Sequence, residues 1–231
     1  MLILALDSSL GPGRAAIIDV TADQTRLLAE RFDPDPKGMA ERLVAMVGAV
    51  LADAGCALSE VHRIAVTTGP GGFTSVRIAL AAAQGLSLSQ AIPLVGLSTL
   101  AVLAQGAFGQ TDLVLAAIPV GRGEIAVQAF DRGQAVTPDP FVGAAQDYDR
   151  LLPSAPFTVC GPAADAPVFA RASRISLNGP DMGPQALLAS RLVPGSPDAS
   201  YQPLYARPPD AKLPDLPPLA DRASSSIPAS S

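Results

Sequence analysis

Near the start of the chain lies the stretch Leu2-Ile3-Leu4-Ala5-Leu6-Asp7-Ser8-Ser9, which indicates how the fold begins. A continuous apolar run ended by a polar cluster predicts a buried strand. The turn Gly11-Pro12-Gly13 and a second apolar run over 15–20 predict that the chain returns as another strand, and a third is expected over 26–32. The sequence therefore opens with strand, turn and strand.

Helices are predicted next, because the spacing of the apolar residues changes. Apolar residues recur at helical spacing over 39–54, and Gly55 stands where a C-cap glycine belongs. A strand over 64–67, a glycine loop and a helix over 74–89 come next, followed by a strand at 94–95 and a helix opened by Ser98 or Thr99. This order predicts a mixed sheet with helices on its faces.

The second half resembles the first at its start and then changes character. Strands are predicted over 113–118 and 125–130, around a turn at 121–123. Of the 23 prolines, 17 lie from residue 138 onward, so the elements there should be short and separated by loops. After Tyr205 the chain is rich in proline and serine, and we expect a flexible tail over 207–231.

Composition narrows the functional classes. The 231 residues carry a net charge of −5 and only 4% are aromatic, which argues against a chain that holds a nucleic acid by itself. Cys56 and Cys160 are far apart and fit neither a zinc pattern nor a disulfide scaffold, so we expect both to be small buried hydrophobes. The short apolar runs predict neither export nor a membrane span, and the cytoplasm is the expected location.

The loop Gly69-Pro70-Gly71-Gly72-Phe73-Thr74-Ser75 is the clearest candidate for binding chemistry, because backbone N–H groups at a helix N-terminus attract anions. It lacks both the Walker A lysine and the dinucleotide G-x-G-x-x-G pattern. A plain glycine turn, with Thr74 or Ser75 capping the helix, is the interpretation that composition favours. Asp7 is equally suited to approaching a phosphate or metal and to starting a turn. The candidate nucleotide or anion residues are Asp7, Ser8, Gly69, Gly71, Gly72 and Thr74.

No catalytic residue or metal ligand is assigned. His62 is the only histidine, which excludes a two-histidine metal site, and we expect it to face solvent. The near miss to a G-x-S-x-G elbow, at 96–100, lacks its final glycine, so Ser98 is interpreted as a helix cap. Arg122 and Glu124 flank the second turn, where a solvated pair is favoured over a contact in a cleft between lobes.

Two features of the second helix indicate a binding surface. The small residues Ala79, Ala81, Ala82, Ala83 and Gly85 would let another backbone approach closely. Arg77 lies in the first turn, where a cation opposes the helix dipole, which indicates an acidic partner or ligand nearby.

Several blocks together carry a family resemblance, which extends from residue 2 to about 213. In order they are Leu4-Ala5-Leu6-Asp7-Ser8-Ser9, Glu41-Arg42-Leu43, Gly69-Pro70-Gly71-Gly72-Phe73-Thr74-Ser75-Val76-Arg77-Ile78, Ile92-Pro93-Leu94-Val95-Gly96-Leu97-Ser98-Thr99-Leu100 and Tyr205-Ala206-Arg207-Pro208-Pro209-Asp210-Ala211-Lys212. The set resembles the TsaB/YeaZ family. The segment Ile118-Pro119-Val120-Gly121-Arg122-Gly123-Glu124 departs from the family's I-D-A-R-R-G-E and loses an acidic and a basic side chain. Gly72 replaces the family's serine and Ser75 its glycine.

The resemblance implies an α/β fold of two ribonuclease-H-like lobes, of the actin and sugar-kinase superfamily. We expect an N-terminal lobe over 1–110, a smaller lobe over 111–206 and the tail. It also implies a non-catalytic dimerisation subunit, which pairs with the TsaD and TsaE homologues for threonylcarbamoyl transfer to the tRNA adenosine next to the anticodon. No cofactor is expected in this chain, whereas ATP or ADP and metal are expected on the partner subunits, and tRNA would be reached only through the complex.

In the family the partner surface is built by the two helices of the first lobe, and a homodimer forms through it when the partner is missing. The residues that this implies are Glu41, Arg42, Met46, Phe73, Arg77, Ile78, Ala81, Ala82 and Gly85. The minor alternatives are a phosphotransferase of the same superfamily and a peptidase-like enzyme. A direct tRNA-binding module would show salt-sensitive binding of tRNA by the isolated chain.

Overall fold

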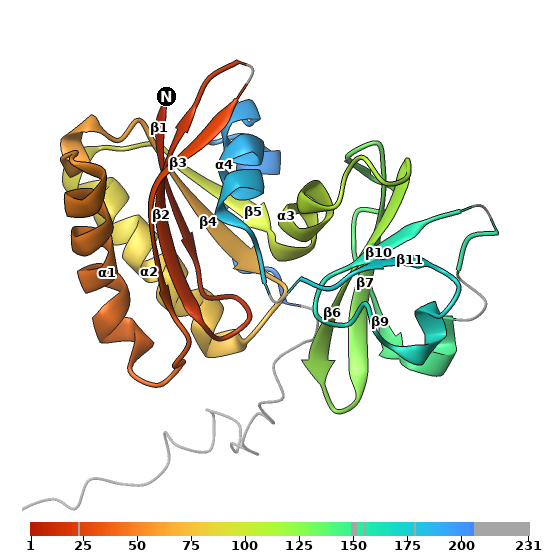
Figure 1. Cartoon of the computed structure of the whole chain (residues 1–231). Coiled ribbons are helices and arrows are strands. Elements are labelled where there is room, and N and C mark those ends of the chain that lie inside the picture. Colours follow the sequence, from red (N-terminus) through yellow and green to blue (C-terminus); the bar gives the residue numbers. More distant parts are fainter. Residues whose placement is uncertain (23, 149–151, 155, 178, 206–231) are drawn as a thin grey trace, which may run out of the picture.

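The computed structural model describes residues 1–22, 24–148, 152–154, 156–177 and 179–205. Its first lobe is built on a five-stranded sheet in the order β3-β2-β1-β4-β5 (Figure 1). β1 (Leu2–Asp7), β2 (Gly13–Val20) and β3 (Thr25–Asp33) form an antiparallel meander. β4 (Arg63–Gly69) runs parallel to β1, and β5 (Leu94–Ser98) runs parallel to β4. The three strands predicted from the opening sequence are confirmed.

Helices cover both faces of this sheet, as the continuous apolar sequence of β1 requires. Leu4 and Leu6 face α1 (Met39–Ala54) and α2 (Phe73–Gln90), whereas Ile3 and Ala5 pack against α4 (Met182–Arg191). Successive side chains of a strand point to opposite faces, so a strand covered on both sides is apolar throughout. α1 and α2 form the outer layer at one side of the molecule (Figure 1).

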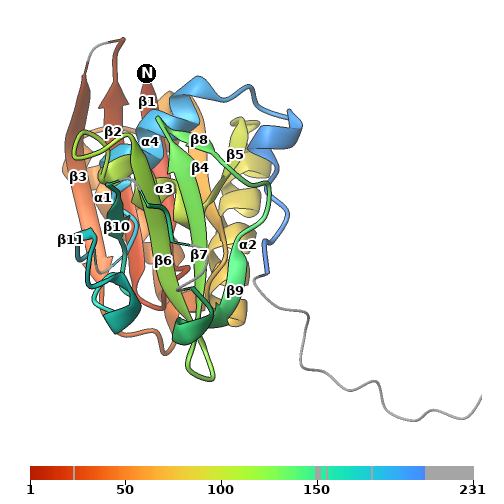
Figure 2. The same ribbon diagram turned by 90° about the vertical axis from the view of Figure 1, so that its right-hand side faces the viewer.

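The second lobe is built on a six-stranded sheet in the order β11-β10-β6-β7-β8, with β9 also paired to β7. Its strands are β6 (Leu113–Gly121), β7 (Glu124–Asp131), β8 (Gln134–Ala135), β9 (Phe141–Ala144), β10 (Thr158–Cys160) and β11 (Ser173–Ile175). Seen from the side of this lobe, β6 and β7 lie in front of the first sheet (Figure 2). α3 (Thr99–Gly106) lies between the two sheets and packs on β6.

The expected smaller lobe over 111–206 needs a correction. After β11 the chain returns to the first lobe, where Met182, Ala186 and Ala189 of α4 pack among β1, β2 and β5. Gln185, also on α4, is fully buried and donates hydrogen bonds to the carbonyl oxygens of Leu6 and Ala65. The face of the first sheet opposite α1 and α2 is also apolar, and α4, from later in the chain, packs against it. The expected tail, 207–231, lies outside the described residues.

Candidate partner-binding surface

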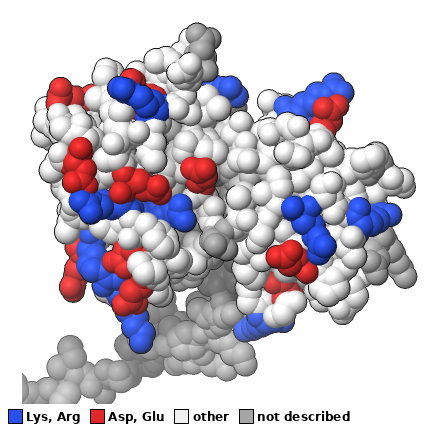
Figure 3. Space-filling view, in the orientation of Figure 1, with Lys and Arg blue, Asp and Glu red and all other residues white. Residues whose placement is uncertain are grey.

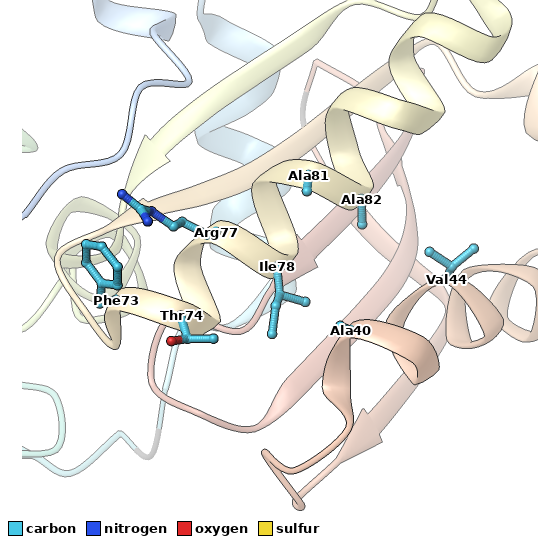
Figure 4. Close-up of a pocket in the computed structure, with 8 residues that line it drawn as sticks. All are labelled: Ala40, Val44, Phe73, Thr74, Arg77, Ile78, Ala81 and Ala82. Carbon is cyan, nitrogen blue, oxygen red and sulfur yellow. The ribbon is translucent and has the colours of Figure 1, made fainter. Parts of the chain in front are cut away.

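An apolar groove lies on the outer surface of the first lobe, between α1 and α2. It has a volume of about 520 Å³ and is lined by Ala40, Val44, Phe73, Thr74, Arg77, Ile78, Ala81 and Ala82. Ile78 and Ala82 on α2 and Val44 on α1 point toward one another across it (Figure 4). Val44 is 51% exposed and Phe73 is 44% exposed, so large apolar side chains face solvent here. Exposed apolar surface concentrated in one place is typical of a protein–protein contact.

The spacing of residues on the two helices explains the groove. On α1, Met39, Leu43, Val47 and Val50 are buried against the sheet, which leaves Ala40 and Val44 on the outer side. On α2, Ala79 and Ala83 are buried, while Ala81, Ala82 and Gly85 are exposed or half-buried. The buried small residues of α2 therefore let the helix pack closely on the sheet, and the exposed ones leave a surface of little side-chain bulk toward solvent.

The structure separates the residues that the sequence assigned to this surface. Phe73, Arg77, Ile78, Ala81 and Ala82 line the groove. Gly85 is exposed on α2 and Glu41 is exposed on α1, while Met46 is half-buried and packs against the core. Sequence reasoning missed Ala40 and Val44, although their four-residue spacing on α1 was visible. It also placed Thr74 only in the anion loop, whereas the structure places it at the groove.

Arg42 is occupied within its own chain. Its Nε donates a 2.5 Å hydrogen bond to the Asp33 carboxylate, and its two terminal nitrogens donate to the carbonyl oxygens of Lys37 and Asp35. The Asp33 hydrogen bond raises the pKa of Arg42 and lowers that of Asp33. Arg42 thus braces the loop between β3 and α1, and its contacts are with that loop.

The turn around Ser9 packs against the candidate anion loop and accepts a hydrogen bond from it. The Gly72 N–H donates a 2.7 Å hydrogen bond to the Ser9 carbonyl, and that same carbonyl leaves no room for a Cβ at Gly71. Gly69 has a positive φ of 100°, which favours glycine. The Ser8 hydroxyl donates to the Ser75 carbonyl at 2.6 Å. The described residues that line a cavity of about 280 Å³ between this loop, Pro119 and Pro162 are all uncharged.

Asp7 is 3% exposed and receives hydrogen bonds from the Thr67 hydroxyl and the Ser9 N–H. Burial raises the pKa of its carboxyl, while those two hydrogen bonds oppose the rise. Its geometry is that of the turn-starting aspartate, one of the two interpretations of the sequence.

Other expectations have mixed outcomes. The prediction that Thr74 or Ser75 caps α2 is wrong, because the helix begins at Phe73 after Gly72 and has no side-chain cap. Ser98 precedes α3 at the N-cap position, but its side chain makes no capping hydrogen bond. Cys160 is buried as expected, whereas Cys56 is half-exposed.

Aromatic and hydrogen-bonding contacts surround the start of α2. The Arg77 guanidinium lies 3.8 Å from the centre of the Phe73 ring, on the side of α2 away from α1 (Figure 4). Its Nε donates a 2.8 Å hydrogen bond to the hydroxyl of Tyr205, and the Tyr205 ring stacks on Phe73 at 5.1 Å. The sequence block around Tyr205 therefore reaches two residues that line the groove, although its remaining residues lie outside the described part of the chain.

On the face shown in Figure 3, Lys and Arg side chains are interspersed with Asp and Glu rather than gathered into one basic patch. Within the described ranges, no three His, Cys, Asp or Glu side chains converge on a point where a metal ion could bind. Of the described helices, none combines the length and apolar character that crossing a bilayer requires.

Two sheets with helices at their faces, joined through α3, define a two-lobed α/β protein. The family model "TsaD: tRNA N6-adenosine threonylcarbamoyltransferase" matches residues 36–152, half of the chain. The "tRNA threonylcarbamoyladenosine biosynthesis protein TsaB" of Escherichia coli is 35% identical over 136 residues, which cover 58% of this chain and 57% of the relative. An uncharacterized protein of Mycobacterium tuberculosis is 31% identical over 91% of this chain and 93% of its own length.

Two solved structures whose descriptions name YeaZ are also similar to this chain. "YeaZ from Pseudomonas aeruginosa" is similar with a TM-score of 0.65 and 27% identity, over 82% of this chain and 90% of that one. A second Pseudomonas aeruginosa protein, described as having similarity to peptidase YEAZ, has a TM-score of 0.70 and 26% identity, over 89% of this chain and 99% of that one. The chain belongs to the TsaB/YeaZ family.

Proposed function

We propose that this chain is a non-catalytic dimerisation subunit that binds a TsaD homologue through the groove between α1 and α2. With a TsaE homologue, the pair supports transfer of a threonylcarbamoyl group to the tRNA adenosine next to the anticodon. The observation that carries the proposal is the exposed apolar groove, lined on α2 by small residues. The names of the Escherichia coli and Haemophilus influenzae relatives, as tRNA threonylcarbamoyladenosine biosynthesis proteins, supply the pathway.

The groove suits helices of a partner better than a small ligand. Ala81, Ala82 and Gly85 carry little side-chain bulk, and a Cβ added at Gly48 or Gly85 would meet nothing within 4 Å. Helices that pack at short interaxial distances need small residues at the contact. The matching TsaD family model spans both α1 and α2, so a TsaD-type partner would present a related helix pair. The same surface would pair with itself about a two-fold axis when the partner is missing.

The first-lobe loop supports assigning the chemistry to the partner. Asp7 is buried, and the Gly72 N–H is already bonded to the Ser9 carbonyl. The described residues that line the neighbouring cavity are neutral, so none of them offers a phosphate a charged side chain. In this proposal ATP or ADP and any metal are bound by the partner subunits in the cytoplasm, and tRNA is reached only through the complex.

Co-purification with the TsaD homologue of the same organism tests the proposal. Ala81→Arg places a long charged side chain in the groove from an exposed position, so the chain should fold and lose the partner. Ala170→Arg makes the same change at an exposed alanine of the second lobe and serves as the matched control. The proposal predicts a one-to-one complex for the unchanged chain and for Ala170→Arg. Failure of the unchanged chain to bind would overturn it, as would unimpaired binding by Ala81→Arg.

A further inference from the structure

A short segment near the end of the described chain, residues 200–205, crosses β5 at Gly96 and β4 at Thr68; we call it the strap. A Cβ at Gly96 on β5 would lie 2.6 Å from the Cα of Tyr201, so only glycine lets the strap pass at this distance. The Leu204 N–H donates a 2.7 Å hydrogen bond to the Thr68 carbonyl on β4. The strap is therefore fixed by backbone contacts to two strands, and it delivers Tyr205 to the first turn of α2.

Tyr205 makes contact with two exposed side chains at the start of α2, Phe73 and Arg77. Its ring stacks on Phe73 with centroids 5.1 Å apart and planes inclined by 30°. Its hydroxyl accepts the 2.8 Å hydrogen bond from the Nε of Arg77, whose guanidinium lies over the Phe73 ring. The hydrogen bond joins residues that are 128 positions apart in the sequence.

Arg77 is poorly placed for the stability of its own helix. The first turn of α2 contains no acidic residue, and none of the ion pairs among the described residues involves Arg77. A cation at this end of a helix opposes the helix dipole. Of its five N–H donors, the one on Nε is bonded to Tyr205, while those on the two terminal nitrogens have no hydrogen bond within the described chain.

We propose that Tyr205 is a positioning residue, which holds the Arg77 guanidinium ready for a carboxylate on the docked partner. The inference rests on the proposed function, from which it takes the partner. The two terminal nitrogens of a guanidinium match the two oxygens of a carboxylate, and Arg77 borders the groove. A side chain that is already held loses less conformational freedom on binding, so the pair gains affinity.

A double-mutant cycle on binding to the TsaD homologue tests this. Tyr205→Phe keeps the ring on Phe73 and removes only the hydroxyl, so affinity should fall by about three- to tenfold while the melting temperature stays unchanged. In an Arg77→Gln background the same change should have no further effect, because the held group is gone. Equal losses in both backgrounds, or no loss in either, would overturn the proposal.

Two further measurements distinguish positioning from a structural role. The affinity of the unchanged chain should fall more steeply with salt than that of Arg77→Gln, because only the former forms the ion pair. Tyr201→Phe removes a hydroxyl from the same strap, one that makes no hydrogen bond among the described residues, and should bind as the unchanged chain does. Equal salt dependence would contradict the proposal. A wild-type chain that does not bind at all would instead contradict the proposed function.

Discussion

The hydroxyl of Thr67 on β4 donates a hydrogen bond to the carboxylate of Asp7 on β1, in the interior where the two parallel strands end. The Ser9 N–H donates a second, of 2.9 Å, to the same oxygen. A residue that sequence patterns place equally well beside a phosphate or at a turn is thus used to hold the start of the loop after β1. The cost of this arrangement is a buried ionisable group.

Asp7 should make stability depend on pH. Burial raises the pKa of its carboxyl in the folded chain, so the folded state favours the protonated form more than the unfolded state does. Its favourable contribution is complete below the unfolded pKa and is lost as pH rises through the raised folded value. Asp7→Asn keeps an oxygen acceptor and removes this titration. We therefore expect the free energy of unfolding of the unchanged chain to fall relative to Asp7→Asn as pH increases from about 4 to 8.

Urea unfolding of both chains across that pH range provides the measurement. If the two curves of unfolding free energy against pH run parallel, the carboxyl does not titrate with a raised pKa and the assignment fails.

The passage of the strap over Gly96 should be sensitive to a single methyl group. Gly96→Ala would bring its Cβ against the Ser200 carbonyl and the Tyr201 Cα, both backbone atoms, so the strap must shift. We expect a loss of about 1–3 kcal/mol of unfolding free energy. Gly48→Ala, in the exposed side of α1, meets open space and should instead stabilise by about 0.5–1 kcal/mol through helix propensity. Thermal unfolding of both variants decides, and a Gly96→Ala chain as stable as the original would refute the close packing.

The two cysteines should differ in reactivity. Cys160 is fully buried and burial raises the pKa of its thiol to about 12, whereas Cys56 is only partly buried. The thiolate is the reactive form, so both access and ionisation protect Cys160. We expect a thiol-specific reagent at pH 8 to modify one cysteine of the native chain and two after unfolding. Mass spectrometry of the modified peptides should find Cys56 alone labelled in the native chain, and rapid native labelling of Cys160 would contradict the packing of β10.

Local signals predicted much of the first lobe. The apolar spacing from Met39 and the glycine at 55 gave the bounds of α1 correctly, because Gly55 adopts a φ of 67° that suits a C-cap glycine. The cover of the other sheet face could not be read in this way. α4 lies more than 160 residues beyond β1 in a proline-rich region, and only tertiary packing places it there.

Only part of the candidate surface could be predicted from the sequence, because the rest also depends on tertiary packing. The small residues of α2 stand out in the sequence, whereas Val44 is an ordinary helical valine until α1 and α2 lie side by side. The contact between Tyr205 and Arg77 depends on the path of the strap, which no local pattern specifies. The family block that contains Tyr205 was the only signal that pointed there.

In the proposed function, the chain supports the transfer reaction through its groove. Measuring the threonylcarbamoyladenosine formed on tRNA by the TsaD and TsaE homologues, with and without this chain, tests this proposal. We predict little product without the chain, restoration by the unchanged chain and by Ala170→Arg, and no restoration by Ala81→Arg. Product formed by this chain without the TsaD homologue, or full restoration by Ala81→Arg, would contradict the account.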